Sequence, residues 1–242
     1  MSVTPRFSSE RGFTLTELVI AMALGMIVLL AAFTVIDRSF ANNKAVQDRE
    51  DALQRGRITL ELMTREIRSM TCAGLYTPVT KGTDNEIDFY GYMGDPTAGG
   101  STLPQLHKLV YDPTAMTISE TDYPVTSVGD NTTPPTVSNT PSVPTKVLLN
   151  NVVPVTGVPI FSYYTFDPTA TQGTGAFVAL NAGSTGLSTA DQVKVVKVAI
   201  NFLTRPTGIK VNDPHSTTFQ DDVFWRAVDP ESPNAQPCSQ GT

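Results

Sequence analysis

A long uninterrupted apolar run lies close to the start of the chain. Residues 18–36 read LVIAMALGMIVLLAAFTVI, without a charge or a proline, and Thr34 is the one polar side chain. As a helix with a rise of about 1.5 Å per residue, the run spans about 28 Å, close to the thickness of a bilayer core. We therefore predict a membrane-spanning helix. A buried core helix usually keeps a polar face, and a secretory signal has a shorter apolar run. An ordinary membrane anchor would explain the length equally well.

An amphipathic pattern follows the apolar run. Residues 37–70 contain no proline and are rich in Arg, Glu, Gln and Ala, which favours a continued helix. Apolar positions recur every seven residues, at Val46, Leu53, Leu60 and Ile67, with Met63 and Met70 between or beyond them. This stripe predicts a face that packs on a C-terminal sheet, with a coiled-coil seam as the alternative. Gly56 is expected to weaken the helix locally by about 1 kcal/mol relative to alanine.

Beyond the helical segments, the pattern changes to short β-type runs separated by turn residues. The expected strands cover residues 87–90, 108–111, 116–119, 146–153, 160–166, 193–203 and 223–228. The sequence Asp-Pro-Thr at 112–114 predicts a hairpin turn between the second and third of them. The longest run, VKVVKVAINFL, predicts a central strand. Roughly 170 residues make one domain, so we predict a single β-rich head.

Two segments of the head lack the composition of a packed core. Residues 124–145 read PVTSVGDNTTPPTVSNTPSVPT and hold almost no large apolar residues, which predicts an extended surface loop. The residues after Asp229 are rich in Pro, Ser and Gln and are expected to form a tail. The sequon at 131–133, Asn-Thr-Thr, carries little weight because such matches are frequent by chance.

The most specific motif stands in front of the apolar run, where residues 11–18 read RGFTLTEL. This segment resembles the class III leader of type IV prepilins and pseudopilins, which has a short basic leader, a glycine, then Phe-Thr-Leu-x-Glu-Leu and an apolar helix. The resemblance implies that a prepilin peptidase cuts between Gly12 and Phe13 and methylates the new amine of Phe13. The leader, residues 1–12, would stay in the cytoplasm, as the positive-inside bias expects.

Glu17 is the one carboxylate in this otherwise lipid-compatible helix. Cleavage would leave the Phe13 amine one helical turn away, on the same face. A carboxylate is costly in hydrocarbon, and the expected partner is the Phe13 amine of an adjacent subunit, because pairing neutralises two charges that are each expensive to bury alone. Such pairing would also fix the axial offset between subunits. The alternatives are that Glu17 snorkels to the interface or stays protonated.

A second resemblance, of lower specificity, lies in residues 53–68, LQRGRITLELMTREIR. They are similar to the stalk of PilW-like minor pilins and of J-type pseudopilins of type II secretion, whose pattern has a Gln, an Arg and a Leu-x-x-Asp/Glu-Ile/Leu-Arg sequence. Major pilins usually carry a proline where Thr34 stands here, and this chain is long for a major pilin. The implied fold is α+β, with a long N-terminal helix packed on a β-rich globular head.

The resemblance divides the chain into a cleaved leader (1–12), a transmembrane and filament-core helix (13–36), an amphipathic stalk (37–72) and a β-rich head (73–242). It implies a minor pilin that initiates or caps a type IV pilus. The expected partners are other minor and major pilins through the N-terminal helix, the prepilin peptidase, an inner-membrane assembly platform, and membrane lipid before assembly. The protein would cross the inner membrane once, with a periplasmic head, and then enter a pilus. The alternatives are a J-type pseudopilin and, in another class, a membrane-anchored binding or enzymatic domain.

Composition adds the two cysteines and the charge. The formal net charge is −6, so the composition shows no excess of basic residues of the kind that binds nucleic acid. Cys72 would close the stalk, and Cys238 lies near the C-terminus. In an oxidising periplasm the two can form one disulfide, which would close a loop of about 165 residues and contribute about 5 kcal/mol on the chain-entropy model. Two free thiols are the alternative.

No catalytic residue, metal site or cofactor is predicted. His107 falls in a strand-like run and His215 follows a turn, and neither has a nucleophile or acid at motif spacing, so both are interpreted as ordinary surface or turn residues. The cysteine spacing does not match a zinc site. The pairs Asp221-Asp222 and Asp130-Asn131 could bind calcium by residue type, but they lack the ligand spacing of a known calcium cage.

Overall fold

The computed structural model describes residues 14–92, 103–130, 133–167, 169, 176–206, 216–225 and 238. Gly12 and Phe13, His215 and the tail apart from Cys238 lie outside the described residues, as do two positions of the sequon. The chain forms two compact units, Met1–Gln47 and Asp48–Thr242.

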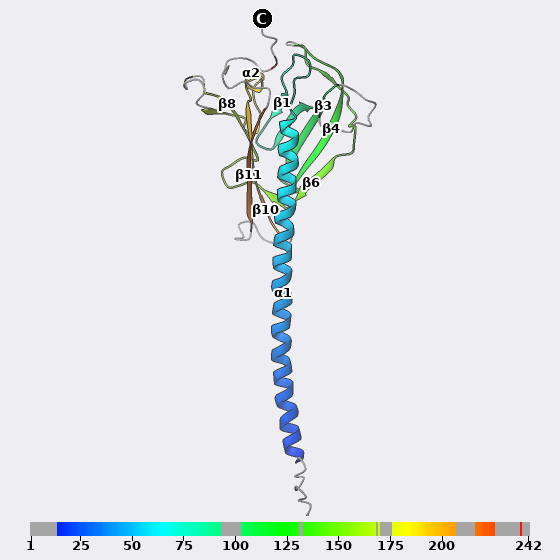
Figure 1. The fold of residues 1–242 in the computed structure, drawn as a ribbon, viewed down its shortest axis with the longest axis vertical. Coiled ribbons are helices and arrows are strands. Elements are labelled where there is room, and N and C mark those ends of the chain that lie inside the picture. The colour runs from blue at the N-terminus through cyan, green and yellow to red at the C-terminus, as the bar shows by residue number, and fades with distance from the viewer. Residues whose placement is uncertain are drawn as a thin grey trace, which may run out of the picture. The chain divides into compact units, whose positions relative to one another are not determined.

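The helix α1 extends over Leu15–Arg68 (Figure 1). Among the described residues it is the one helix long and apolar enough to cross a membrane, with a mean hydropathy of 2.8 over its most apolar 18-residue window. Thr34, the polar residue of the apolar run, donates its hydroxyl to the carbonyl of Ala31 at 2.7 Å, so its hydrogen bond is satisfied within the helix. The last turn tightens, because Met70 N–H bonds Ile67 O at 3.1 Å, and the helix ends four residues before Cys72, where the predicted stalk ended.

The unit from Asp48 contains two antiparallel sheets (Figure 1). The first has the order β1-β2-β3-β4-β5, with β6 also paired to β4; its strands are β1 Val79–Gly82, β2 Glu86–Gly91, β3 Gln105–Asp112, β4 Thr117–Ser127, β5 Thr136–Val137 and β6 Lys146–Asn150. The second has the order β11-β10-β8-β9, with β7 paired to β10; its strands are β7 Val152–Val153, β8 Phe161–Phe166, β9 Phe177–Leu180, β10 Lys197–Thr204 and β11 Thr217–Phe224. A single-turn helix, α2 (Thr189–Gln192), precedes β10 and is capped by Ser188.

The core of the head joins both sheets to the C-terminal part of α1. Met63 and Ile67 of the helix belong to the same buried cluster as Phe89 of the first sheet and Phe202 of the second. Trp225, just after β11, donates its indole N–H to the carbonyl of Met70 at 2.7 Å. The predicted α+β fold, a long N-terminal helix with a β-rich head, is therefore confirmed.

The face of α1 that packs on the head differs from the predicted stripe. The buried residues of the helix are Ala52, Gly56, Thr59, Met63, Thr64, Glu66 and Ile67. The heptad prediction was wrong for Val46, which is 55% exposed, and only half right for Leu53 and Leu60, which are half-buried. The face begins with small side chains because the helix approaches β11 closely there: a Cβ on Gly56 would lie 2.4 Å from Cε2 of Phe219.

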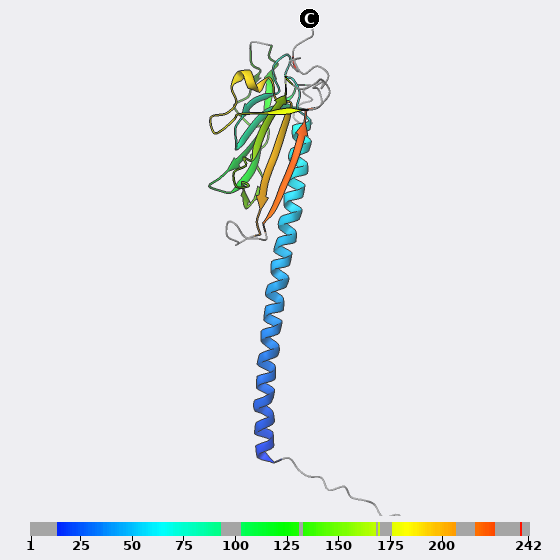
Figure 2. The same cartoon turned by 90° about the vertical axis from the view of Figure 1, so that its left-hand side faces the viewer.

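Figure 2 shows β11 lying alongside the C-terminal part of α1. The contact includes a hydrogen bond from the Thr64 hydroxyl to Oδ2 of Asp221 at 2.8 Å. Thr59 reaches the other sheet and donates its hydroxyl to the carbonyl of Leu148 in β6 at 3.1 Å. The helix is thus hydrogen-bonded to both sheets, through polar side chains of its buried face.

The strand predictions were right in place and inexact in extent. Each predicted run overlaps a strand, and β10 is central as predicted, because it pairs with β7, β8 and β11. The expected surface loop at 124–145 was wrong at its start, since β4 continues to Ser127 and β5 pairs with it through Val125 and Val137. Residues 193–196, predicted as strand, instead follow α2. The strands β1 and β9 were not predicted.

Candidate functional site

The start of α1 is closed by a reciprocal cap between Thr14 and Glu17. Oε2 of Glu17 accepts hydrogen bonds from the backbone N–H and the hydroxyl of Thr14, both at 3.1 Å, and the N–H of Glu17 donates to the Thr14 hydroxyl at 3.3 Å. This is a capping box, in which a Thr and a Glu three residues later satisfy each other's N–H groups. The motif Thr-x-x-Glu is present in the sequence at 14–17 and is the signal that could have predicted this cap. The cap holds its carboxylate at the helix start, next to the position of Phe13.

The two cysteines are joined in the structure. Cys72 and Cys238 form a disulfide with a Cα–Cα distance of 5.6 Å and a sequence separation of 166. Both half-cystines pack against the main core cluster. The bond fastens a residue of the C-terminal segment to the chain just beyond the end of α1.

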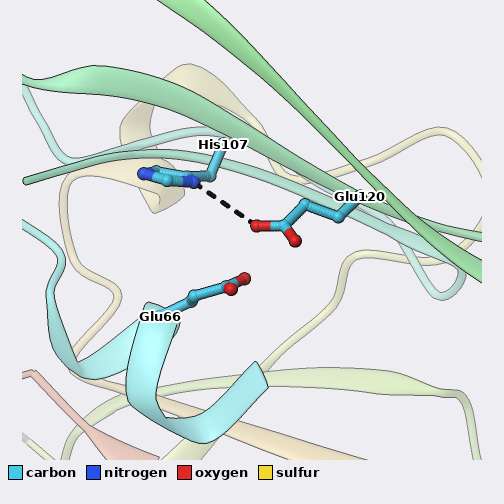
Figure 3. Close-up of side chains that lie close together, drawn as sticks. All are labelled: Glu66, His107 and Glu120. Atoms are coloured by element: carbon cyan, nitrogen blue, oxygen red, sulfur yellow. Dashed lines mark ion pairs between the residues drawn. The ribbon is translucent and has the colours of Figure 1, made fainter. Parts of the chain in front are cut away.

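A cluster of four ionisable side chains lies inside the head. His107 comes from β3, Glu120 and Asp122 come from β4, and Glu66 comes from α1. Figure 3 shows Glu66, His107 and Glu120. The register pairs His107 with Asp122 and Leu109 with Glu120, and directly paired residues of antiparallel strands share one face of the sheet. Nδ1 of His107 lies 2.8 Å from Oδ1 of Asp122 and 3.7 Å from Oε1 of Glu120.

These side chains are buried, and burial sets their protonation. Glu66, His107 and Glu120 are 5%, 1% and 8% exposed. Burial, and then the neighbouring Glu120, raise the pKa of Glu66 to about 9. Burial opposes the charged form of His107, but the carboxylates of Asp122 and Glu120 outweigh it and raise the pKa of His107 to about 9. At neutral pH the cluster therefore holds a neutral Glu66 and an imidazolium.

The ring of His107 is held in a fixed orientation. Phe89 stacks on it, with ring centroids 5.3 Å apart and 19° between the planes. On β2, a Cβ at Gly91 would lie 3.2 Å from Cδ2 of His107, so the missing side chain leaves room for the imidazole. The interpretation of His107 as an ordinary surface or turn residue was wrong, because it is among the fully buried side chains of the head.

The signal for His107 was present in its strand. It alternates with Leu109 and Tyr111, so it shares their inward face. Its carboxylate neighbours had no such signal, because Glu66 and Glu120 are brought to it by helix packing and strand register. The acidic pair in β11 has structural partners: Asp221 accepts from Thr64, and Asp222 forms an ion pair with Lys197 at 3.1 Å. Asp130 accepts the N–H of Thr133 at 2.6 Å.

The fold and the N-terminus together define a class of protein: one apolar helix able to cross a membrane, followed by a β-rich head closed by a disulfide. Residues 7–33 match the model of the prokaryotic N-terminal methylation motif. This match supports a type IV pilin-like protein, with a methylation motif and a helix able to cross a membrane. The motif implies processing by a prepilin peptidase and assembly with other pilins, and it points to a structural protein. Comparison with curated proteins and with solved structures gave no match.

Proposed function

We propose that this chain is a minor pilin that initiates or caps a type IV pilus. The observation that carries the proposal is the methylation motif at residues 7–33, which includes most of the apolar part of α1. Thr34 stands where major pilins usually carry proline, and the stalk sequence at 53–68 is similar to that of PilW-like minor pilins. A subunit present in few copies can carry a large head, because the head has to fit only at the end of a filament.

In this proposal the processed N-terminus is the assembly site. Cleavage between Gly12 and Phe13 creates an amine next to Thr14, the residue that Glu17 caps. Within one chain, Glu17 is occupied by that cap. In a filament core without water, the carboxylate gains by meeting the Phe13 amine of a neighbouring subunit, since an unpaired buried charge is costly. Glu17 would thus cap the helix in the membrane and pair between subunits after extraction.

Two other functions fit part of the same observations. A J-type pseudopilin of a type II secretion system would share the leader, the helix and the stalk sequence, and genes for a secretin and secretion components beside this one would favour it. A membrane-anchored binding or enzymatic domain would use the helix only as an anchor and would keep an unprocessed leader.

The test is the mature N-terminus together with the partners. Mass spectrometry of the protein from sheared filaments and from membranes should find a terminus at Phe13 carrying one N-methyl group. Gly12→Ala should leave full-length protein in the membrane and exclude it from the filament fraction. An intact Met1 terminus in assembled filaments would contradict the proposal. Crosslinking that recovers secretion components in place of pilus components would favour the pseudopilin.

A further inference from the structure

The cluster of Glu66, His107 and Glu120 has the geometry of a set of metal ligands. One donor atom from each side chain lies within 4.8 Å of the other two. In Figure 3 the carboxylates of Glu66 and Glu120 and the near edge of the His107 ring point into one common space. The three come from α1, β3 and β4, so no single local pattern placed them together. Donors around a tetrahedral Zn²⁺ stand about 3.3–3.6 Å apart at bond lengths of about 2.0–2.2 Å, and Nδ1 of His107 lies 3.7 Å from Oε1 of Glu120.

A second observation points to a ligand in the same place. Within the described part of the chain, Oε2 of Glu66, both ring nitrogens of His107 and Oδ1 of Asp122 are buried and make no aligned hydrogen bond. Asp122 is at ion-pair distance from His107, yet off the line that an N–H···O bond needs. Buried polar groups are normally satisfied, so the unsatisfied Oε2 of Glu66 and Nδ1 of His107, which face the same space, require a reason.

We propose that Glu66, His107 and Glu120, with Asp122 beside them, bind a single divalent transition-metal ion of the Zn²⁺ type. Binding of a divalent cation would displace the proton of Glu66 and a proton of the His107 imidazolium, and would give the open donor atoms a partner. One imidazole with carboxylates suits Zn²⁺ and its first-row neighbours, whereas Ca²⁺ and Mg²⁺ prefer oxygen ligands alone. The stacking of Phe89 on His107 fixes the ring that carries the donor nitrogen, as the surroundings of metal-binding histidines usually do.

The position of the site gives the ion a structural role. Glu66 lies in the last turn of α1, and the other ligands lie on the two longest strands of the first sheet. A bound ion would cross-link the end of the stalk helix to that sheet, opposite the contact between α1 and β11. Because only the folded head brings these segments together, metal binding would stabilise the folded state.

The experiment uses the full-length protein in detergent, stripped with EDTA and then titrated with Zn²⁺ against a chromophoric chelator. We expect one Zn²⁺ per chain, a rise in Tm of the head followed by Trp225 fluorescence, and no such rise with Ca²⁺. Co²⁺ at the same site should show visible absorption bands of a nitrogen–oxygen ligand set. Glu66→Gln and Glu120→Gln keep the shape of the side chains and should each weaken Zn²⁺ binding by at least about 100-fold.

Two controls separate this site from binding at the surface. Glu61→Gln changes an exposed glutamate of the same helix, and His215→Gln removes the second histidine of the chain; both should bind Zn²⁺ as the wild type does. Because Trp225 reports folding, a variant that fails to fold is recognised before its binding is measured. The proposal is overturned if the folded wild type binds no stoichiometric Zn²⁺, because the charges of the cluster would then be balanced by protonation of its side chains alone. It is equally overturned if both Gln variants bind Zn²⁺ unchanged.

Discussion

The helix approaches the sheet closely at Gly56, and adding one methyl group there should destabilise the head. A Cβ at this position would lie 2.4 Å from Cε2 and 2.6 Å from Cζ of Phe219, and 2.8 Å from Cγ2 of Thr204. The Phe219 ring cannot turn away freely, because it stacks on the fully buried Phe202 with centroids 5.4 Å apart. Gly56→Ala therefore forces the ring or the helix to move.

Two opposing free energies decide the size of the effect. Replacing a helical glycine by alanine normally stabilises by about 1 kcal/mol. Overpacking a well-filled interface costs about 1–3 kcal/mol, and contacts this short place the cost in the upper half of that range. We expect Gly56→Ala to lower the free energy of unfolding by about 1–2 kcal/mol. A Phe219→Ala background removes the two shortest contacts, so the same substitution should there be neutral or stabilising by up to about 1 kcal/mol, and the two positions should couple by at least about 1 kcal/mol.

The assay is urea unfolding of the detergent-solubilised protein, followed by the emission of Trp225, the single tryptophan of the chain. Its indole bonds Met70 just past the end of α1, so its emission reports whether the head is packed on the helix. Gly25→Ala is the matched control, because nothing lies within 4 Å of a Cβ there, and the stability of the head should not change. A Gly56→Ala protein more stable than the wild type by about 1 kcal/mol would show that the close contact with β11 is absent.

Three further outcomes are expected. Cys72→Ser should lower the stability of the head by a few kcal/mol, less than the roughly 5 kcal/mol of the loop-entropy model, and Cys238→Ser should match it in the same unfolding assay. Burial raises the pKa of Asp88 to about 6, against the attraction of Lys108. The stability from its protonated form is complete below about pH 3.8 and is lost as the pH rises through 6. Asp88→Asn should therefore raise the free energy of unfolding by about 3 kcal/mol at pH 7.5 and leave it unchanged at pH 3.5; equal gains at both values would refute this. Glu17→Gln keeps the capping box, which accepts Glu or Gln, but removes the charge; processing should persist while co-purification with other pilins is lost. Normal filament numbers with this variant would leave Glu17 as a cap only.

The sequence was most informative where structure is local. The apolar run and the charged segment after it each have a composition that suits a helix, so α1 could be predicted almost to its end. Strands with alternating patterns, such as β10, were found for the same reason. The helix face was misjudged because large side chains were given the most weight, whereas Ala52, Gly56 and Thr59 are buried by being small.

The His107 cluster could be predicted only in part from local sequence patterns. The inward face of β3 follows from alternation and could have placed His107 inside. The carboxylates that meet it depend on the register of β3 with β4 and on the rotation of α1 about its axis. Local sequence patterns predict neither the strand register nor the rotation of the helix. A register shift of one residue, for example, would send Glu120 to the other face of the sheet.

The disulfide has a mechanical consequence. In the second sheet β11 is an edge strand, and among the described strands it is hydrogen-bonded to β10 alone, so a single ladder holds it in the sheet. Here the C-terminal end is not free, because Cys238 is bonded to Cys72 just beyond α1. When the head is pulled between α1 and the C-terminal segment, the load passes from Cys72 to Cys238 through the sulfur bridge and bypasses the residues of the closed loop. A head pulled in this way should therefore resist unfolding more in the oxidised than in the reduced state.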